Sequence, residues 1–306
     1  MPDILVIGSL NADLVVRAPH FPKPGETISG DDLQIIPGGK GANQAVAAAR
    51  QGASVAMLGR VGKDSFAPFL LDSLKSNSVD VTHVHADDSA TGTAIIVVDA
   101  NGQNSIVLSA GANGKVSLAD VDHASALRPS LILLQLEIPT LTVLHAAQYA
   151  KQNNIRVILN PAPAKPLPNE LISLADFIIP NETELSLLTG LEVKDIPSAE
   201  QAAKVLLKRG AKNVIVTLGS KGALVVSSQQ VTHMEAYKVE VVDTTAAGDA
   251  FIGGFASALL RGFEIEEAVK YANACGALAA TKFGAQPSLP TKEEVEQIVN
   301  LPHGKP

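Results

Sequence analysis

The chain has 306 residues, of which 46% are hydrophobic and 18% are charged, enough for one large α/β domain or two ordinary ones. Its formal net charge of −7 argues against a general nucleic-acid or membrane-surface binder. No apolar run approaches the roughly 18 residues of a membrane span, and the first three residues lack the pattern of a signal peptide. The single cysteine, Cys275, cannot form an internal disulfide. We therefore expect a cytoplasmic protein without nucleic-acid or membrane partners, with Cys275 as a small core residue.

Short apolar runs alternate with amphipathic stretches along most of the chain. The expected strands are 4–7, 33–36, 131–136, 157–159, 177–179, 214–218 and 224–226, and the expected helices are 45–50, 140–152, 183–189, 199–209 and an Ala-rich helix from about Phe251. Apolar strands separated by helices are typical of a parallel sheet that is covered on both faces. The pattern predicts an α/β fold with a mostly parallel central sheet flanked by helices.

Two segments depart from this alternation. Residues 14–37 contain alternating β-type residues with Pro and Gly, and 93–108 is typical of a hairpin around Ala100, Asn101 and Gly102. We expect these segments to form a small additional β-sheet.

Polar residues follow two of the predicted strands. Asn11 and Asp13 come soon after 4–7, and Glu137 comes directly after 131–136. Ligands of open α/β sheets bind at the carboxyl ends of strands, where a carboxylate can accept hydrogen bonds from hydroxyl groups. Considered alone, Asn11 and Asp13 could be turn formers and Glu137 an exposed loop acid.

A glycine-rich segment, 37–43, connects a predicted strand to a predicted helix. Its glycines allow a small molecule to approach the main chain, and Lys40 and Asn43 add donors for hydroxyl groups. The segment is not a Walker A loop, because Gln34 takes the place of its first glycine and no Ser or Thr follows Lys40. It is not a dinucleotide fingerprint, because Gln44 takes the place of the last glycine.

The segment 243–249 lies between a β-type run, 239–242, and the predicted Ala-rich helix. The free N–H groups and the dipole of such a helix start favour an anion, so 246–248 could form an anion hole. Asp249 would repel that anion, and it is better understood as a base directed at a hydroxyl group. Together these features indicate phosphoryl transfer to an alcohol. The alternative is that Asp249 caps the helix.

Two further segments suit a nucleotide site. Asn181 and Glu184 could hold hydrated Mg²⁺ at the sheet edge, or they could form a reciprocal helix cap. The glycine-containing pattern of residues 217–222 predicts a tight turn between two strands.

Six motifs occur in one order along the chain: N-x-D (11–13), PGET (24–27), GGKGANQA (38–45), NETE (181–184), TLGSKG (217–222) and DTTAAGD (243–249). On these motifs the chain resembles the ribokinase-like (PfkB) sugar kinases from about residue 4 to residue 296. Many relatives have glycine where this chain has Ala246. Because an anion hole uses main-chain N–H groups, we expect Ala246 to be tolerated with a negative φ. The Ala-Ala pair favours the ribokinase-like branch.

The resemblance implies roles for particular residues. Sugar would be bound by Asn11, Asp13, Gly39, Lys40, Asn43, Glu137 and Asp249, and the catalytic turn would comprise Ala246, Ala247, Gly248 and Asp249. ATP would be bound by Asn181, Thr217, Gly219, Gly222, Gly248 and Asn273, Mg²⁺ by Glu184, and K⁺ by Asp243, Thr245, Ala279, Lys282, Gly284 and Ser288. It also implies a kinase core (1–12, 38–91 and 109–306) and a β lid (13–37 and 92–108) that covers the sugar and joins a homodimer.

The implied reaction is ATP-dependent phosphorylation of D-ribose at its 5-hydroxyl. Deoxyribose, another sugar or a nucleoside remains an alternative substrate of the same chemistry. A non-catalytic sugar or nucleotide sensor would be expected to lack Asp249, which is present. A dehydrogenase is disfavoured because no Gly-x-Gly-x-x-Gly follows a strand.

Overall fold

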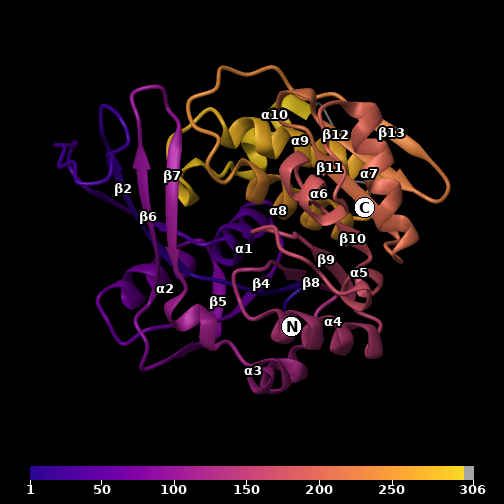
Figure 1. The fold of residues 1–306 in the computed structure, drawn as a ribbon. Helices are drawn as coiled ribbons and strands as arrows, with labels where there is room; N and C mark the ends of the chain where they lie inside the picture. The colour runs from indigo at the N-terminus through magenta and orange to yellow at the C-terminus, as the bar shows by residue number, and fades with distance from the viewer. Residues whose placement is uncertain (300–306) are drawn as a thin grey trace.

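The computed structural model describes residues 1–299, and a nine-stranded sheet forms their centre (Figure 1). In sheet order the strands are β13 (Val231–Met234), β12 (Ala223–Ser227), β11 (Asn213–Thr217), β10 (Phe177–Ile178), β9 (Arg156–Leu159), β8 (Leu131–Leu134), β1 (Ile4–Ile7), β4 (Val55–Val61) and β5 (Val79–Ala86). Neighbouring strands from β11 to β5 are parallel, and β12 and β13 are antiparallel additions at one edge. The predicted mostly parallel sheet is confirmed.

Helices cover both faces of this sheet. One face carries α1 (Lys40–Arg50), α2 (Phe66–Ser76), α8 (Ala247–Leu260), α9 (Ile265–Ala279) and α10 (Lys292–Val299), and the other carries α3 (Leu118–His123), α4 (Thr140–Gln152), α5 (Asn169–Leu174), α6 (Glu182–Thr189) and α7 (Ile196–Lys208). Because both faces are covered, β1 and β8 are buried at every residue, which explains their unbroken apolar sequences. Within residues 1–299, no helix is both long and apolar enough to cross a membrane.

A second sheet stands apart from the main one, with β2, β6 and β7 at the upper left of Figure 1. Its order is β3 (Gln34–Gly38), β2 (Asn11–Arg17), β6 (Gly92–Val98) and β7 (Asn104–Ser109). The predicted hairpin is present, since β6 and β7 pair antiparallel and the Asp99 N–H donates to the Gln103 carbonyl at 2.9 Å. The additional sheet predicted from the sequence is therefore confirmed.

The segment before α8 differs from the sequence prediction. Residues 239–242 form no strand, and the side chains of Val241 and Val242 are 60% and 62% exposed. A run of β-type residues pairs only where neighbouring strands and a buried face support it, and none does so here. Helix α8 also begins at Ala247 rather than near Phe251, so Asp249 lies within its first turn.

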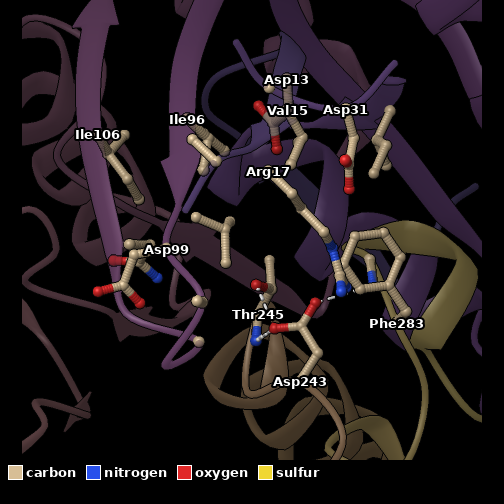
Figure 2. Close-up of a pocket in the computed structure, with 18 of the residues that line it drawn as sticks. Asp13, Val15, Arg17, Asp31, Ile96, Asp99, Ile106, Asp243, Thr245 and Phe283 are labelled. Atoms are coloured by element: carbon tan, nitrogen blue, oxygen red, sulfur yellow. Dashed lines mark hydrogen bonds between the residues drawn. The ribbon is translucent and has the colours of Figure 1, made fainter. Parts of the chain in front are cut away.

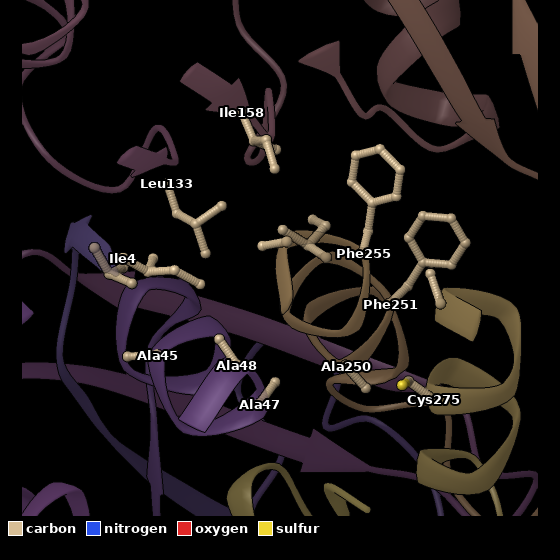
Figure 3. Close-up of a cluster of buried hydrophobic side chains, with 14 of the residues drawn as sticks. Ile4, Ala45, Ala47, Ala48, Leu133, Ile158, Ala250, Phe251, Phe255 and Cys275 are labelled. Atoms are coloured by element: carbon tan, nitrogen blue, oxygen red, sulfur yellow. The ribbon is translucent and has the colours of Figure 1, made fainter. Parts of the chain in front are cut away.

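Helices α1 and α8 pack closely at Gly253. A Cβ atom on Gly253 would lie 2.4 Å from the Ala47 Cβ and 2.7 Å from the Ala48 main-chain nitrogen. Figure 3 shows the alanines of α1 beside α8, with buried Cys275 of α9 also against α8. Small residues on both helices therefore allow their main chains to approach.

We expect Gly253→Ala to lower the free energy of unfolding by on the order of 1–3 kcal/mol through overpacking. Gly248→Ala in the same helix is the matched control, because its Cβ would meet no atom within 4 Å. Alanine is the better helix former by about 1 kcal/mol, so the control should be neutral or stabilising. Equal midpoints of urea unfolding for the two variants would contradict the proposed close contact.

Candidate active site

The carboxyl ends of β1 and β8 meet at the point where the strand order reverses. The Ser9 hydroxyl, just after β1, donates to Oε2 of Glu137 at 2.5 Å, and the Lys40 N–H donates to the same oxygen at 3.1 Å. Gly39 has φ +89°, and a Cβ there would lie 2.7 Å from the Asn11 nitrogen. The glycine-rich segment thus passes directly over this sheet edge, where open α/β folds bind ligands.

Asn11 and Asp13 lie in β2 and not in a turn. The Asn113 amide donates to Oδ1 of Asn11 at 2.7 Å, which fixes the Asn11 side chain. Asp13 is only 8% exposed, and its carboxylate lines a cavity of about 770 Å³. Burial raises the pKa of Asp13 to about 7; the carboxylates of Glu137 and Asp249 add to the shift and Lys40 opposes it.

This first cavity separates the second sheet from the loops around Asp243 and Phe283. Figure 2 shows Asp13, Val15 and Ile96 on the sheet side, opposite Asp243, Thr245 and Phe283. The Arg17 guanidinium lies 4.8 Å from the centre of the Phe283 ring. Phe283 also packs on the buried cluster of Val15, Ala94 and Ile96. The cavity is therefore lined by charged side chains, including Asp13, Arg17 and Asp243, as well as by an apolar wall.

The start of α8 differs from the prediction at Ala246. This residue precedes the helix with φ +59° and ψ 7°, a left-handed conformation, whereas a negative φ was expected. Glycine adopts this conformation without steric cost, whereas alanine does so only with strain. Ala246 therefore holds a main-chain conformation here that is uncommon for its residue type.

Asp249 does not cap α8, because the helix start has no side-chain cap hydrogen bond. Its carboxylate is 6% exposed and accepts two side-chain amides from α1: Asn43 Nδ2 donates to Oδ2 at 3.0 Å and Gln44 Nε2 donates to Oδ1 at 2.9 Å. Oδ1 of Asn43 is buried without a partner in residues 1–299. Asp249 is therefore fixed against the glycine-rich segment, with a free acceptor beside it.

A second cavity, of about 870 Å³, opens on the other side of Asp249. Every residue predicted for the nucleotide lines it, together with the catalytic turn: Asn181, Thr217, Gly219, Gly222, Asn273, Glu184, Ala246, Ala247, Gly248 and Asp249. Four sequence-distant segments are thus brought together. Lys40 also lines this cavity. Burial would lower the pKa of Lys40, but the carboxylates of Asp249, Glu137, Glu184 and Asp13 hold it above its usual value.

Asn181 and Glu184 form the reciprocal cap that the sequence allowed. The Glu184 N–H donates to Oδ1 of Asn181 at 2.8 Å, and the Asn181 N–H donates to Oε2 of Glu184 at 2.9 Å. Burial raises the pKa of Glu184, while the Asn181 N–H and Lys40 oppose the shift. Oε1 of Glu184 accepts no hydrogen bond within residues 1–299, so the cap leaves one carboxylate oxygen for a ligand.

The residues predicted for K⁺ are only partly brought together. Oδ1 of Asp243 accepts the Thr245 N–H and hydroxyl at 2.9 and 2.6 Å, and Oδ2 accepts the Gly284 N–H at 3.0 Å. The Lys282 ammonium instead pairs with Glu294 at 2.6 Å. Ser288 donates its hydroxyl to the Ala285 carbonyl, and Ala279 ends α9 outside both cavities.

Three residues of the site were not predicted from the sequence: Gln44, Gln135 and Asn160. Nε2 of Gln44 lies between Asp249 and Asn160, and its Oε1 accepts Gln135 Nε2 at 2.6 Å. A usable signal was present, because Gln135 and Asn160 each directly follow a fully apolar strand end at the ligand-binding edge.

The raised pKa of Asp13 predicts a pH-dependent stability. The folded chain binds this proton more tightly than the unfolded chain, so the free energy of unfolding falls as pH rises from about 3.8 towards 7. We expect Asp13→Asn to become more stable than wild type by on the order of 1 kcal/mol per pH unit between pH 5 and pH 7. Thermal unfolding of wild type and Asp13→Asn across this pH range measures this difference in stability. Exposed Asp31→Asn, from the same cavity, is the control, and a pH-independent difference for Asp13→Asn would contradict the argument.

Known proteins share both sequence and fold with this chain. The model for "pfkB family carbohydrate kinase" matches residues 1–292. A ribokinase from Haemophilus influenzae is 46% identical over 97% of this chain and 98% of its own length, and a deoxyribokinase from Salmonella typhi is 42% identical over 98% and 99%. The structure of Arabidopsis thaliana ribokinase complexed with ribose and ATP superposes with a TM-score of 0.90 at 35% identity, over 98% and 99% of the two chains. The chain therefore belongs to the pfkB family of carbohydrate kinases.

Proposed function

We propose that this protein transfers the γ-phosphoryl group of ATP to the 5-hydroxyl of D-ribose. The observation that carries the proposal is the place of Asp249. Its buried carboxylate lies at the start of α8, lines the second cavity, and is hydrogen bonded to the glycine-rich segment beside Asp13 and Glu137. A base at the junction of a polar pocket and a larger cleft suits transfer between two substrates.

In this mechanism Asp249 orients the sugar hydroxyl and accepts its proton as the oxygen attacks phosphorus. The start of α8 stabilises the charge on the transferring group. Within residues 1–299 the N–H groups of Ala246 and Gly248 have no acceptor, whereas the Ala247 N–H donates to the Thr244 carbonyl at 3.2 Å. Ala246 and Gly248 are therefore the main donors that we assign to the anion hole.

The sugar would occupy the Asp13 end of the first cavity, next to the glycine-rich segment. Asp13 lines this cavity, and Lys40, Glu137 and the unpaired Oδ1 of Asn43, which lie outside its lining, would provide further charged and polar groups for the sugar hydroxyls. Asn11 would contact the sugar through its fixed side-chain amide, and Gly39 would contact it through the main chain. We propose that residues 13–37 and 92–108 act as a lid on the core, which excludes water that could hydrolyse ATP.

Two ions fit residues that are present. Glu184, with one uncommitted oxygen in the second cavity, would hold Mg²⁺ through water, and the ion would neutralise phosphate charge there. K⁺ would be held by main-chain carbonyls, because those of Asp243, Thr245, Lys282 and Gly284 accept no hydrogen bond in residues 1–299. Asp243 would contribute by holding the 243–245 and 282–284 segments together.

We also propose a homodimer through the lid and a cytoplasmic location. The lid strands expose Ile35, Ile95, Val107 and Leu108, and Leu33 just before β3 is exposed as well, which is an unusual amount of apolar surface on one small sheet. The only cysteine is a buried free thiol, consistent with a reducing compartment.

Deoxyribose is the strongest alternative acceptor, because the chain is about as similar to a deoxyribokinase as to several ribokinases. Other sugars and nucleosides would be phosphorylated by the same chemistry but would need different contacts in the acceptor pocket. Loss of one hydroxyl partner in a tight polar site should cost on the order of 1–3 kcal/mol. The substrate preference of this chain is therefore measurable as a ratio of kcat/KM.

The test is ATP-dependent ADP release with Mg²⁺ and either ribose, deoxyribose, fructose, arabinose or adenosine, with and without K⁺. We expect kcat/KM for ribose to exceed the other values by about tenfold or more, and K⁺ to raise it. A higher kcat/KM with one of the other compounds would identify that compound as the substrate and leave the proposed phosphoryl transfer unchanged. No turnover on any of them would contradict the kinase proposal.

Asp249→Ala should lower kcat by about a hundredfold or more, because the group that accepts the hydroxyl proton is removed. Ribose affinity, measured by calorimetry, should stay within a few-fold, since the other sugar-binding groups remain. Near-normal turnover in this variant would show that Asp249 is not the base.

A further inference from the structure

Three buried side-chain amides, Gln135, Gln44 and Asn160, form a connected group that ends on Asp249; we call it the amide chain. Gln135 Nε2 donates to Gln44 Oε1 at 2.6 Å, and Gln44 Nε2 donates to Asp249 Oδ1 at 2.9 Å and to Asn160 Oδ1 at 3.2 Å. Gln135 directly follows β8, Gln44 lies in α1 and Asn160 directly follows β9, so three segments meet at the amide that contacts Asp249.

The hydrogen-bond donors and acceptors of the amide chain have one consistent orientation. Asn160 Nδ2 donates to the Ile179 carbonyl at 3.0 Å, which turns Asn160 Oδ1 towards Gln44. Gln44 must then present its nitrogen to Asn160 and Asp249 and its oxygen to Gln135, since an amide oxygen cannot donate. The donor that faces Asp249 is therefore specified by groups that do not touch Asp249.

The carboxylate of Asp249 is held at both oxygens. Asn43 occupies one acceptor position on Oδ2 and Gln44 occupies one on Oδ1. Each carboxylate oxygen has about two such positions, so one on each oxygen remains for a sugar hydroxyl. The two amide donors, one on each oxygen, prevent rotation of the carboxylate.

One atom of the amide chain lacks a hydrogen-bond partner. Gln135 is fully buried, and its Oε1 has no hydrogen-bond partner within residues 1–299. A Cβ on Gly8 would lie 2.1 Å from that oxygen, so glycine is what makes room for it. A buried acceptor without a partner lowers the free energy of unfolding, so the orientation of Gln135 towards Gln44 is held at a cost to stability.

We propose that Gln44, oriented by Gln135 and Asn160, is a positioning residue that keeps the Asp249 carboxylate directed at the sugar hydroxyl. This inference rests on the proposed kinase function. Asp13, Lys40 and Glu184 also interact electrostatically with Asp249, and Glu137 acts on Asp13 and Lys40. None of these charged groups is altered by a change at Gln44 or Gln135.

The test uses Gln44→Met, which has a similar shape but no amide, and compares kcat and KM of ribose phosphorylation. We expect kcat to fall by about 10- to 100-fold, since the carboxylate is no longer held towards the hydroxyl. The KM for ribose should change by less than about threefold. Gln135→Met should lower kcat by less, because Gln44 keeps its amide but is then free to turn.

Gln51→Met is the matched control. Gln51 is also a buried glutamine at the end of α1, with bonds to the Pro290 carbonyl and the Tyr271 hydroxyl at 2.8 and 2.7 Å, and it lines neither cavity. Its loss should lower the free energy of unfolding and leave kcat and the KM for ribose unchanged.

A kcat in Gln44→Met equal to that in Gln51→Met would overturn the inference while leaving the kinase function intact. If Gln44→Met does not fold, the same criterion applies to Gln135→Met. Wild-type protein that phosphorylates none of the tested acceptors would overturn the proposed function and this inference with it.

Discussion

The close contact between α1 and α8 is the constraint on which the rest of the site depends. Gly253 and Ala47 allow the two helices to touch, and one turn away from this contact Asn43 and Gln44 reach Asp249. The two segments are more than 200 residues apart in the chain. Because α1 follows the glycine-rich segment and α8 follows the 243–246 turn, one packing contact brings a polar pocket and an anion-binding helix start to the same carboxylate.

The electrostatics of the site follow from this crowding. Asp13, Glu137 and Asp249 act on one another around Lys40, and the result is an acid with a raised pKa and a lysine whose charged form is favoured. This crowding of charged groups lowers the free energy of unfolding of the free protein. A bound polyhydroxylated ligand can offset part of that loss, because its hydroxyls supply the missing hydrogen bonds. Family membership and this local balance together support phosphoryl transfer to a sugar.

The sequence predicted the fold better than the site. The parallel sheet was predictable because buried strands such as β8 have unbroken apolar sequences, and the Asn181 to Glu184 cap has a local four-residue pattern. The 239–242 run was mispredicted because β-type residues favour a strand only where a partner strand lies alongside. The convergence of Gln44, Gln135 and Asn160 depends on contacts between residues 91 to 205 positions apart, so short-range patterns could place Gln135 and Asn160 at the ligand-binding edge but could not show which residues they contact. The φ of Ala246 was mispredicted, because a left-handed conformation is uncommon for alanine.

A crystal structure with ribose and a non-hydrolysable ATP analogue would test the central claim most directly, which is that both substrates meet at Asp249. The quantity to measure is the distance from the Asp249 carboxylate to the 5-hydroxyl oxygen. The account predicts hydrogen-bond contact of about 3 Å, with the terminal phosphoryl group against the start of α8. A sugar bound with its 5-hydroxyl away from Asp249, or a nucleotide outside the second cavity, would contradict it.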